Sequence, residues 1–146
     1  MTELSRELQT LADRIAIDDL MTRYTMAVDS FEWDRLDEVF TPDAHIDYTA
    51  TGGTSGSFPE VKKWLAETLP MFTRLQHYVT QKDVRIDGDE ARVAAYFFNP
   101  MAIDNADGSS FFMEIGGVYH HELVRTDAGW RSRHLHEQLI WDRRSS

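Results

Sequence analysis

The sequence is 146 residues long and carries 25 acidic and 15 basic side chains, which gives a formal net charge of −10. This charge argues against nucleic acid or an anionic membrane as a partner, because phosphate binding requires a basic surface. Its hydrophobic fraction of 42% and charged fraction of 27% are ordinary for a globular chain, so we expect a single domain spanning residues 1–146. The absence of cysteine excludes disulfides, thiolate nucleophiles and sulfur-ligated metals.

The N-terminal segment is "MTELSRELQTLADR", which is charged from its third residue. This charge is unlike a signal peptide. No apolar run of the sequence approaches the roughly 18 residues that a membrane span requires. We therefore expect a cytoplasmic protein.

The next pattern predicts two helices with a break between them. Apolar residues recur at spacings of three and four over residues 4–31, which indicates a long amphipathic helix. A second apolar set over 33–40 predicts a short helix that closes at 41–43. In one straight helix, Asp29 would lie more than about 100° from the centre of the apolar stripe and would face solvent. The break is therefore expected near Asp29, which is either a helix N-cap or an acid–base group at a helix junction.

A short β segment and another helix follow. The segment "AHIDYTA" (44–50) alternates like a strand, and "TGGTSG" (51–56) is a turn-forming loop. The segment "SFPEVKKWLAETLP" (57–70) opens with Ser57 and Glu60 at the spacing of a capping box and has a proline in its first turn. These features predict a helix that ends near residue 70.

The rest of the chain predicts β structure. Four strands are separated by the short turns "DGDE", "DNADGS" and "TDAG", so neighbours are expected to form antiparallel hairpins over residues 75–86, 91–103, 109–125 and 129–142. Helices on one face of a curved antiparallel sheet give an α+β fold in the order α-α-β-α-β-β-β-β. Gly116 and Gly117 indicate a bulge that curls the sheet into a cone enclosing a pocket.

Three segments carry a resemblance to a known family: "DRIAIDDLMTRYTMAVDSFEWDRLDEVFTPDAHIDY", "LQHYV" and "GGVYHHELVRTDAGWR". They are similar to the SnoaL-like branch of the nuclear-transport-factor-2-like superfamily, over nearly the whole chain. Within it, the pattern is most similar to scytalone dehydratase, bile-acid 7α-dehydratase and hexachlorocyclohexane dehydrochlorinase. The resemblance implies a conical α+β barrel with a deep apolar pocket between the long helix and the sheet, and an enzyme without metal or other cofactor.

The resemblance also implies roles for individual residues. Asp29 and His77 match a dyad in which the carboxylate orients and charges the imidazole that removes a proton. Tyr48 matches a tyrosine of the two dehydratases, and Tyr24 matches one of the bile-acid enzyme. Asn99 stands where the bile-acid enzyme has a catalytic aspartate. The dyad is thus retained, whereas the positions that orient substrate and leaving group differ.

Physical chemistry supports proton abstraction by the same residues. A base that removes a proton next to a carbonyl needs a pKa near the operating pH, and histidine is the side chain nearest to that value. A paired carboxylate fixes the tautomer of His77 and stabilises the imidazolium that forms. The hydroxyls of Tyr24 and Tyr48 can donate to the developing enolate oxygen. Strand alternation puts His77, Tyr48 and Asn99 on apolar faces that we expect to point inward.

The expected pocket walls are aromatic and methionine-rich, which suits a flat hydrophobic substrate. Asn99 is expected to hold the substrate or its leaving group. The other expected substrate-binding residues are Phe72, Phe97, Met101, Met113, Tyr119 and Trp141, with Met71 and Ile115 beside them. Taken singly, each of these residues is more often an ordinary core residue, and His77 a satisfied core histidine. The joint match at Asp29, Tyr48 and His77 favours a catalytic pocket.

A second group of polar residues lies in "YHHE" (119–122) and "HLHE" (134–137). His134 and His136 share one strand face, and Glu122 on a neighbouring strand would complete two histidines and one carboxylate, a weak metal signal. A polar outer face or a subunit contact is the favoured interpretation, so no metal site is expected.

We therefore predict a cofactor-independent hydro-lyase that acts on a hydrophobic cyclic carbonyl compound. The alternatives are a ketosteroid-isomerase-like or polyketide-cyclase-like enzyme using the same dyad, a non-catalytic small-molecule-binding module, and a structural subunit like the β chains of ring-hydroxylating dioxygenases. Four β residues that look exposed, together with the resemblance to trimeric dehydratases, predict a homo-oligomer built through sheet faces, a trimer first and a dimer second. These residues are Trp130, Leu135, Leu139 and Trp141.

Overall fold

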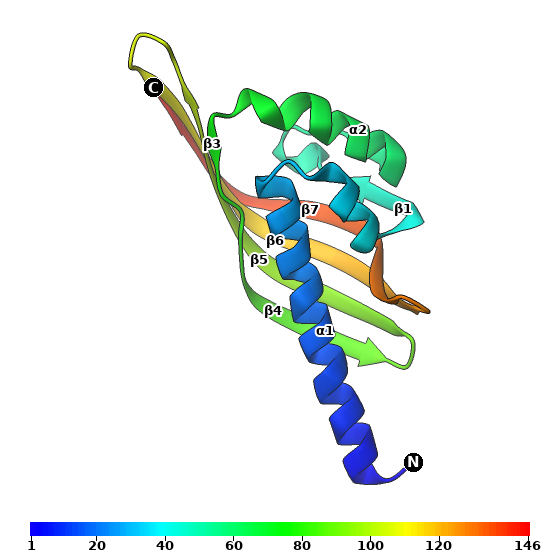
Figure 1. Ribbon diagram of the computed structural model, residues 1–146. Coiled ribbons are helices and arrows are strands. Elements are labelled where there is room, and N and C mark those ends of the chain that lie inside the picture. The colour runs from blue at the N-terminus through cyan, green and yellow to red at the C-terminus, as the bar shows by residue number, and fades with distance from the viewer.

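A long N-terminal helix crosses one face of a curved sheet, and a shorter helix covers the end of the same face (Figure 1). The computed structural model describes residues 1–146. Its helical segments are α1 (Glu3–Asp29), η1 (Trp33–Glu38), η2 (Thr49–Thr51), α2 (Phe58–Thr68) and η3 (Leu69–Met71), of which the η segments are 3-10 helices. Its strands are β1 (Phe40–Asp47), β2 (Ser55–Ser57), β3 (Arg74–Leu75), β4 (Tyr78–Asp87), β5 (Glu90–Asp104), β6 (Ser110–Thr126) and β7 (Gly129–Ser145). The predicted α+β fold is confirmed.

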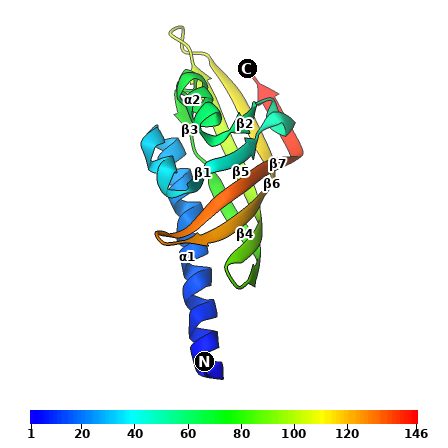
Figure 2. The ribbon, with the colours of Figure 1, turned by 90° about the vertical axis from the view of Figure 1, so that its right-hand side faces the viewer.

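The sheet has the strand order β2-β1-β7-β6-β5, and both β3 and β4 pair with β5. The pairs from β4 to β7 are antiparallel, as predicted. Strand β1 instead runs parallel to β7, so the sheet is mixed rather than wholly antiparallel. Figure 2 shows α1 and α2 on the same side of this sheet, which leaves its other face uncovered.

Helix α1 begins at a side-chain cap and ends at Asp29. The hydroxyl of Thr2 accepts a hydrogen bond from the backbone N–H of Ser5 at 3.0 Å, which satisfies one free donor of the first turn. After the helix, Phe31 takes a positive φ of 58°, so the predicted break near Asp29 is confirmed. The N-terminal half of α1 extends beyond the sheet (Figure 1), and no helix is long and apolar enough to cross a membrane.

The segment after the break differs from the prediction in two ways. The second helix is the 3-10 helix η1 rather than an α-helix, and β1 already begins at Phe40. Residues 41–43 therefore belong to a strand and do not close a helix. The backbone N–H of Ser132 donates to the carbonyl of Val39 at 2.8 Å, so pairing with β7 starts just after η1. Pro42 is tolerated because the register between β1 and β7 is interrupted from Phe40 to His45.

The predicted strand over 75–86 is divided into β3 and β4, with His77 between them. The cause lies in the backbone hydrogen bonds. The N–H of Gln76 donates to the carbonyl of Pro100, whereas the N–H of His77 donates to the carboxylate of Asp29. Helix α1 thus replaces β5 as the partner of His77 at this point.

The bend of the sheet occurs at Gly116 and Gly117, as predicted. The register between β6 and β7 shifts between these two residues. A β-carbon on Gly117 would clash with the backbone carbonyl of Gln138, and one on Gly116 would clash with the indole of Trp141. Both positions therefore require glycine for close approach of β7.

Candidate active site

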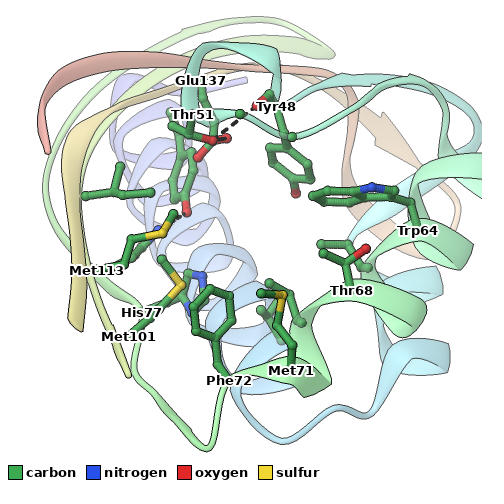
Figure 3. A pocket seen from close by; sticks show the side chains of 18 of the residues that line it. Tyr48, Thr51, Trp64, Thr68, Met71, Phe72, His77, Met101, Met113 and Glu137 are labelled. Carbon is green, nitrogen blue, oxygen red and sulfur yellow. Dashed lines mark hydrogen bonds between the residues drawn. The ribbon is translucent and has the colours of Figure 1, made fainter. Parts of the chain in front are cut away.

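A cavity of about 220 Å³ lies between α1, α2 and the inner face of the sheet (Figure 3). Twelve of the 19 residues that line it are hydrophobic, and no lysine or arginine is among them. Most of the predicted site residues line this cavity: Tyr24, Tyr48, Met71, Phe72, His77, Asn99, Met101, Met113, Ile115 and Tyr119. The wall is completed by Val28, Thr51, Gly52, Gly53, Trp64, Leu65, Thr68, Leu69 and Glu137.

The predicted contact between Asp29 and His77 is present. The Nδ1 atom of His77 lies 2.6 Å from Oδ1 of Asp29, and the backbone N–H of His77 donates to the same carboxylate at 2.9 Å. The imidazole is only 7% exposed and the carboxylate 23%. Because Asp29 holds Nδ1, the remaining nitrogen, Nε2, is the one available to a molecule in the cavity.

Asp29 reaches this position because it is the last residue of α1. It is not the N-cap of the following helix, since Glu32 occupies that position in η1. Its carboxylate is therefore not occupied by helix backbone donors, and all three of its hydrogen bonds are with His77. The end of α1 and the gap between β3 and β4 together create the dyad.

Three tyrosines line the same cavity as His77. The hydroxyls of Tyr24 and Tyr48 lie 2.6 Å apart, and the side-chain amide of Asn99 donates to the hydroxyl of Tyr119 at 2.9 Å. Burial is the main cause that raises the pKa of Tyr24, Tyr48 and Tyr119 above the usual value of a phenol. The three hydroxyls therefore keep their protons and can serve as hydrogen-bond donors.

Asn99 has an unused acceptor. The residue is only 4% exposed, and its Oδ1 atom has no hydrogen-bond partner within the protein. An unpaired buried acceptor is unfavourable, and a hydrogen-bond donor brought to it would remove this cost.

Glu137 is a cavity residue that the sequence analysis did not place in the site. It is only 9% exposed, and its Oε1 atom accepts a hydrogen bond from the hydroxyl of Thr51 at 2.7 Å. Burial is the main cause that raises the pKa of its carboxyl to about 7, and the nearby charge of Asp47 acts in the same direction. The detectable signal was alternation: Glu137 shares a strand face with Leu135, which is fully buried.

Four predicted positions are corrected by the structure. Phe97 is buried and stacks on the ring of Tyr119, with 4.1 Å between the ring centroids, so it supports the wall without lining the cavity. Trp141 is 43% exposed and lies over Gly116 on the outer face of the sheet. Trp130 and Leu135 were expected to be exposed, yet they are 3% and 0% exposed, because both side chains face the helices.

The histidines of β6 and β7 lie mainly on the outer face. The rings of His120 and His136 stack with 4.7 Å between their centroids, and the rings of His134 and His45 stack with 5.5 Å between theirs. No three histidine or acidic side chains converge as metal ligands would. His121 points inward instead, and its Nδ1 lies 2.9 Å from the hydroxyl of Ser132.

The SnoaL-like domain family matches residues 9–136, and the chain belongs to this family. It is 40% identical over 121 residues to an uncharacterised protein of Mycobacterium tuberculosis (strain ATCC 25618 / H37Rv), covering 83% of this chain and 81% of that protein.

Solved structures share the fold. A type 2 hexachlorocyclohexane dehydrochlorinase superposes with a TM-score of 0.81 at 24% identity, covering 96% of this chain and 93% of the other. A candidate scytalone dehydratase of Novosphingobium aromaticivorans superposes with a TM-score of 0.79 at 18% identity, covering 92% and 88%. At these identities the likeness establishes the nuclear-transport-factor-2-like fold alone.

Proposed function

We propose that this protein is a cofactor-independent lyase of the dehydratase type. It would remove a proton next to a carbonyl group of a hydrophobic cyclic substrate and expel a leaving group from the β carbon. The observation that carries the proposal is the 2.6 Å contact between Asp29 and His77, with the imidazole in the wall of a largely apolar cavity. The enzymes named among the structures of the same fold include a dehydrochlorinase, which is compatible with elimination chemistry.

The dyad supplies the base. With its Nδ1–H donated to Asp29, neutral His77 presents a lone pair on Nε2 towards the cavity. Proton transfer to Nε2 produces an imidazolium whose charge is stabilised by the carboxylate of Asp29. The additional bond from the backbone of His77 to that carboxylate keeps the two groups aligned before substrate binds.

The buried tyrosines supply a hydrogen-bond donor for the substrate carbonyl group. Tyr24 has a short hydrogen bond with Tyr48 and a second one with Tyr119. These two bonds use the hydrogens of two of the three hydroxyls and leave that of the third free. The free hydrogen can be donated to the substrate carbonyl oxygen, where negative charge develops during proton removal. Because the pKa of all three phenols is raised by burial, none gives up its proton at neutral pH.

The cavity limits the size of the substrate. An apolar cavity of about 150 Å³ holds benzene, and this one is larger, at about 220 Å³. Trp64, Phe72 and Met113 provide flat or adaptable apolar walls (Figure 3). One ring with substituents, or two small fused rings, is the size of ligand that we expect.

Two variants test the proposed function. His77→Ala removes the base, and Asp29→Asn removes the charge that supports the imidazolium. Each change is expected to lower α-proton exchange on 1-indanone in deuterium oxide by at least about a hundredfold, the usual size of a general-base contribution. The double variant should be scarcely slower than His77→Ala, because the two residues act as a unit.

The control is Asp18→Asn, which neutralises an exposed carboxylate of α1, the helix that also carries Asp29. This carboxylate forms an ion pair with Lys82. Asp18→Asn should leave exchange unchanged. An isomerase or cyclase using the same dyad would exchange the α-proton but eliminate no β substituent. If the wild type binds 1-indanone and does not exchange its α-proton, the non-catalytic binding module is the better description.

A further inference from the structure

The cavity contains a single acidic side chain in its wall, that of Glu137 on β7. Figure 3 shows Glu137 beside Thr51, in a different part of the wall from His77. The hydroxyl of Thr51 donates to Oε1 of Glu137 at 2.7 Å. No lysine or arginine lines the cavity, so no cation neutralises this carboxyl. A buried carboxyl with one neutral donor favours its protonated form.

The groups that face Glu137 explain its protonation. One negative charge, that of Asp47, raises the pKa of Glu137, and the hydrogen bond from Thr51 lowers it, while burial has the largest effect and raises the pKa to about 7. The remaining titratable neighbours are phenols from three segments, which are neutral at this pH: Tyr24, Tyr48 and Tyr119. The carboxyl is therefore an acid that can release its proton near neutral pH.

We propose that Glu137 is the catalytic general acid that protonates a departing hydroxyl group, and that the substrates are accordingly cyclic β-hydroxy carbonyl compounds. This inference rests on the proposed lyase function. It assigns the leaving group, which the dyad alone does not specify. Asn99 lines the same cavity, and its buried Oδ1 has no hydrogen-bond partner.

The elimination then balances within the site. Nε2 of His77 takes the proton from the carbon next to the carbonyl, and the electron pair of that C–H bond becomes the new C=C bond by way of the enolate. The bond between the β carbon and oxygen breaks, and the proton of Glu137 goes to that oxygen, so water leaves. The imidazolium of His77 and the carboxylate of Glu137 return to their starting forms when one proton passes from the first to the second through solvent.

The orientation of the carboxyl follows from Thr51. The Thr51 hydroxyl lies within hydrogen-bond distance of both Oε1 of Glu137 and the carbonyl oxygen of Tyr48. When its single hydrogen is donated to Oε1, the acidic proton of Glu137 resides on Oε2. An acid in this position matters for hydroxide, which is a poor leaving group. It matters little for a group that leaves as a stable anion. The leaving-group dependence of a Glu137 variant is therefore the critical measurement.

The experiment compares three indanones with the wild type, Glu137→Gln and the control Glu122→Gln, which changes a carboxyl next to the outer-face histidines of β6 and β7. In Glu137→Gln we expect loss of water from 3-hydroxyindan-1-one to slow by at least about a hundredfold. Loss of acetate from 3-acetoxyindan-1-one, corrected for the uncatalysed reaction, and α-proton exchange of 1-indanone should change little. Glu122→Gln should behave as the wild type with all three.

A second variant gives a readout that a structural role would not move. Thr51→Val removes the hydrogen bond that lowers the pKa of Glu137, so the loss of dehydratase activity at alkaline pH should shift to higher pH. In Glu137→Gln, the residual activity should lack this alkaline loss. A Thr51→Val profile that coincides with that of the wild type would contradict the proposal.

A titration without turnover separates this inference from the proposed function. Carbon-13 NMR of protein labelled at the glutamate carboxyl carbons should contain one signal that titrates near pH 7 and that is missing from Glu137→Gln. If that carboxyl titrates in the ordinary range of a glutamate, or if Glu137→Gln dehydrates the hydroxy ketone as fast as the wild type, the inference is wrong. Absence of α-proton exchange in the wild type would overturn the lyase function and, with it, the catalytic role of Glu137.

Discussion

At the scale of residues, Asp29 determines both the orientation of the His77 ring and the position of the His77 backbone. Its carboxylate accepts the ring Nδ1–H and the backbone N–H of His77, so it aligns the imidazole and replaces a strand partner of the backbone. A base on an ordinary strand would have its backbone fixed by neighbouring strands alone. Here the position of the base depends on the end of α1, so a change in that helix is transmitted directly to His77.

His121 provides a prediction about acid stability. It is 2% exposed, its Nε2 atom has no partner, and burial lowers its pKa to about 3. Between pH 6.5 and about 3 the unfolded chain binds a proton there and the folded protein does not, so the free energy of unfolding falls as the pH decreases through this range. His121→Gln should reduce this fall, as measured by urea unfolding between about pH 7.5 and pH 5.

Glu137 makes stability depend on pH in the opposite direction to His121, so its variant serves as the comparison. Its folded pKa is raised to about 7, so its contribution to stability is fully present below 4.5 and is lost as the pH rises through 7. Glu137→Gln should therefore stabilise the protein at neutral pH relative to acidic pH. If His121→Gln and the wild type lose stability equally on acidification, other groups control the acid response.

The sequence identified Asp29, His77, Tyr48, Tyr24 and Asn99 as neighbours, because each stands within a recognisable segment or alternates with apolar residues. Their roles stay proposals. Glu137 was missed for a physical reason. Alternation indicates which residues share a face of a strand but not which face is buried. Because Leu135 was assigned to the exposed face, Glu137 on the same face was assigned there as well.

At the scale of elements, α1 is attached to the sheet by an ionic cluster far from the dyad. Asp13 is only 5% exposed and accepts two hydrogen bonds from the guanidinium of Arg125, at 2.7 and 2.9 Å. It also accepts one from the indole N–H of Trp130 at 3.1 Å. The hydrogen bonds from Arg125 are the main cause that lowers the pKa of Asp13, so this attachment persists at neutral pH.

Asp13→Ala should destabilise the protein by about 2 kcal/mol, because the indole N–H of Trp130 and part of Arg125 lose their acceptor in a buried setting. The value is below that of a fully buried ion pair, since Arg125 is 31% exposed and keeps Asp89 as a partner. Asp19→Ala, an exposed change on the same helix, should stay within about 0.5 kcal/mol of the wild type in urea unfolding. An equal effect of the two variants would show that the cluster contributes nothing to stability.

The order of elements was predictable, whereas two long-range pairings were not. Hairpins between consecutive strands follow from short turns and local alternation. The parallel pairing of β1 with β7 joins segments that are far apart in the chain, and no local pattern encodes it. The division of the strand at His77 likewise depends on a carboxylate 48 residues earlier in the chain.

At the scale of the whole molecule, two apolar surfaces are exposed. The first is the N-terminal stripe of α1, formed by Leu4, Leu8, Leu11 and Ile15. The second is an aromatic row on the outer face of the sheet, formed by Tyr78, Phe98 and Trp141. The row is continuous because Gly116 lies between Phe98 and Trp141 in the strand register and leaves room for the indole. Leu139 and Ile140 of β7 are also exposed.

We expect the aromatic row to be the contact surface of a homo-oligomer. Neighbouring aromatic side chains on three strands bury a large apolar area on contact with a second copy. Light scattering at micromolar concentration should give a mass near three times, or otherwise twice, the chain mass of 16.9 kDa. Trp141→Arg should return the chain to a monomer, because it introduces a charge into the row. Leu8→Arg, which changes the stripe on α1, should leave the oligomer intact. A monomeric wild type would contradict the assembly itself, and dissociation by Leu8→Arg alone would move the interface to the helix.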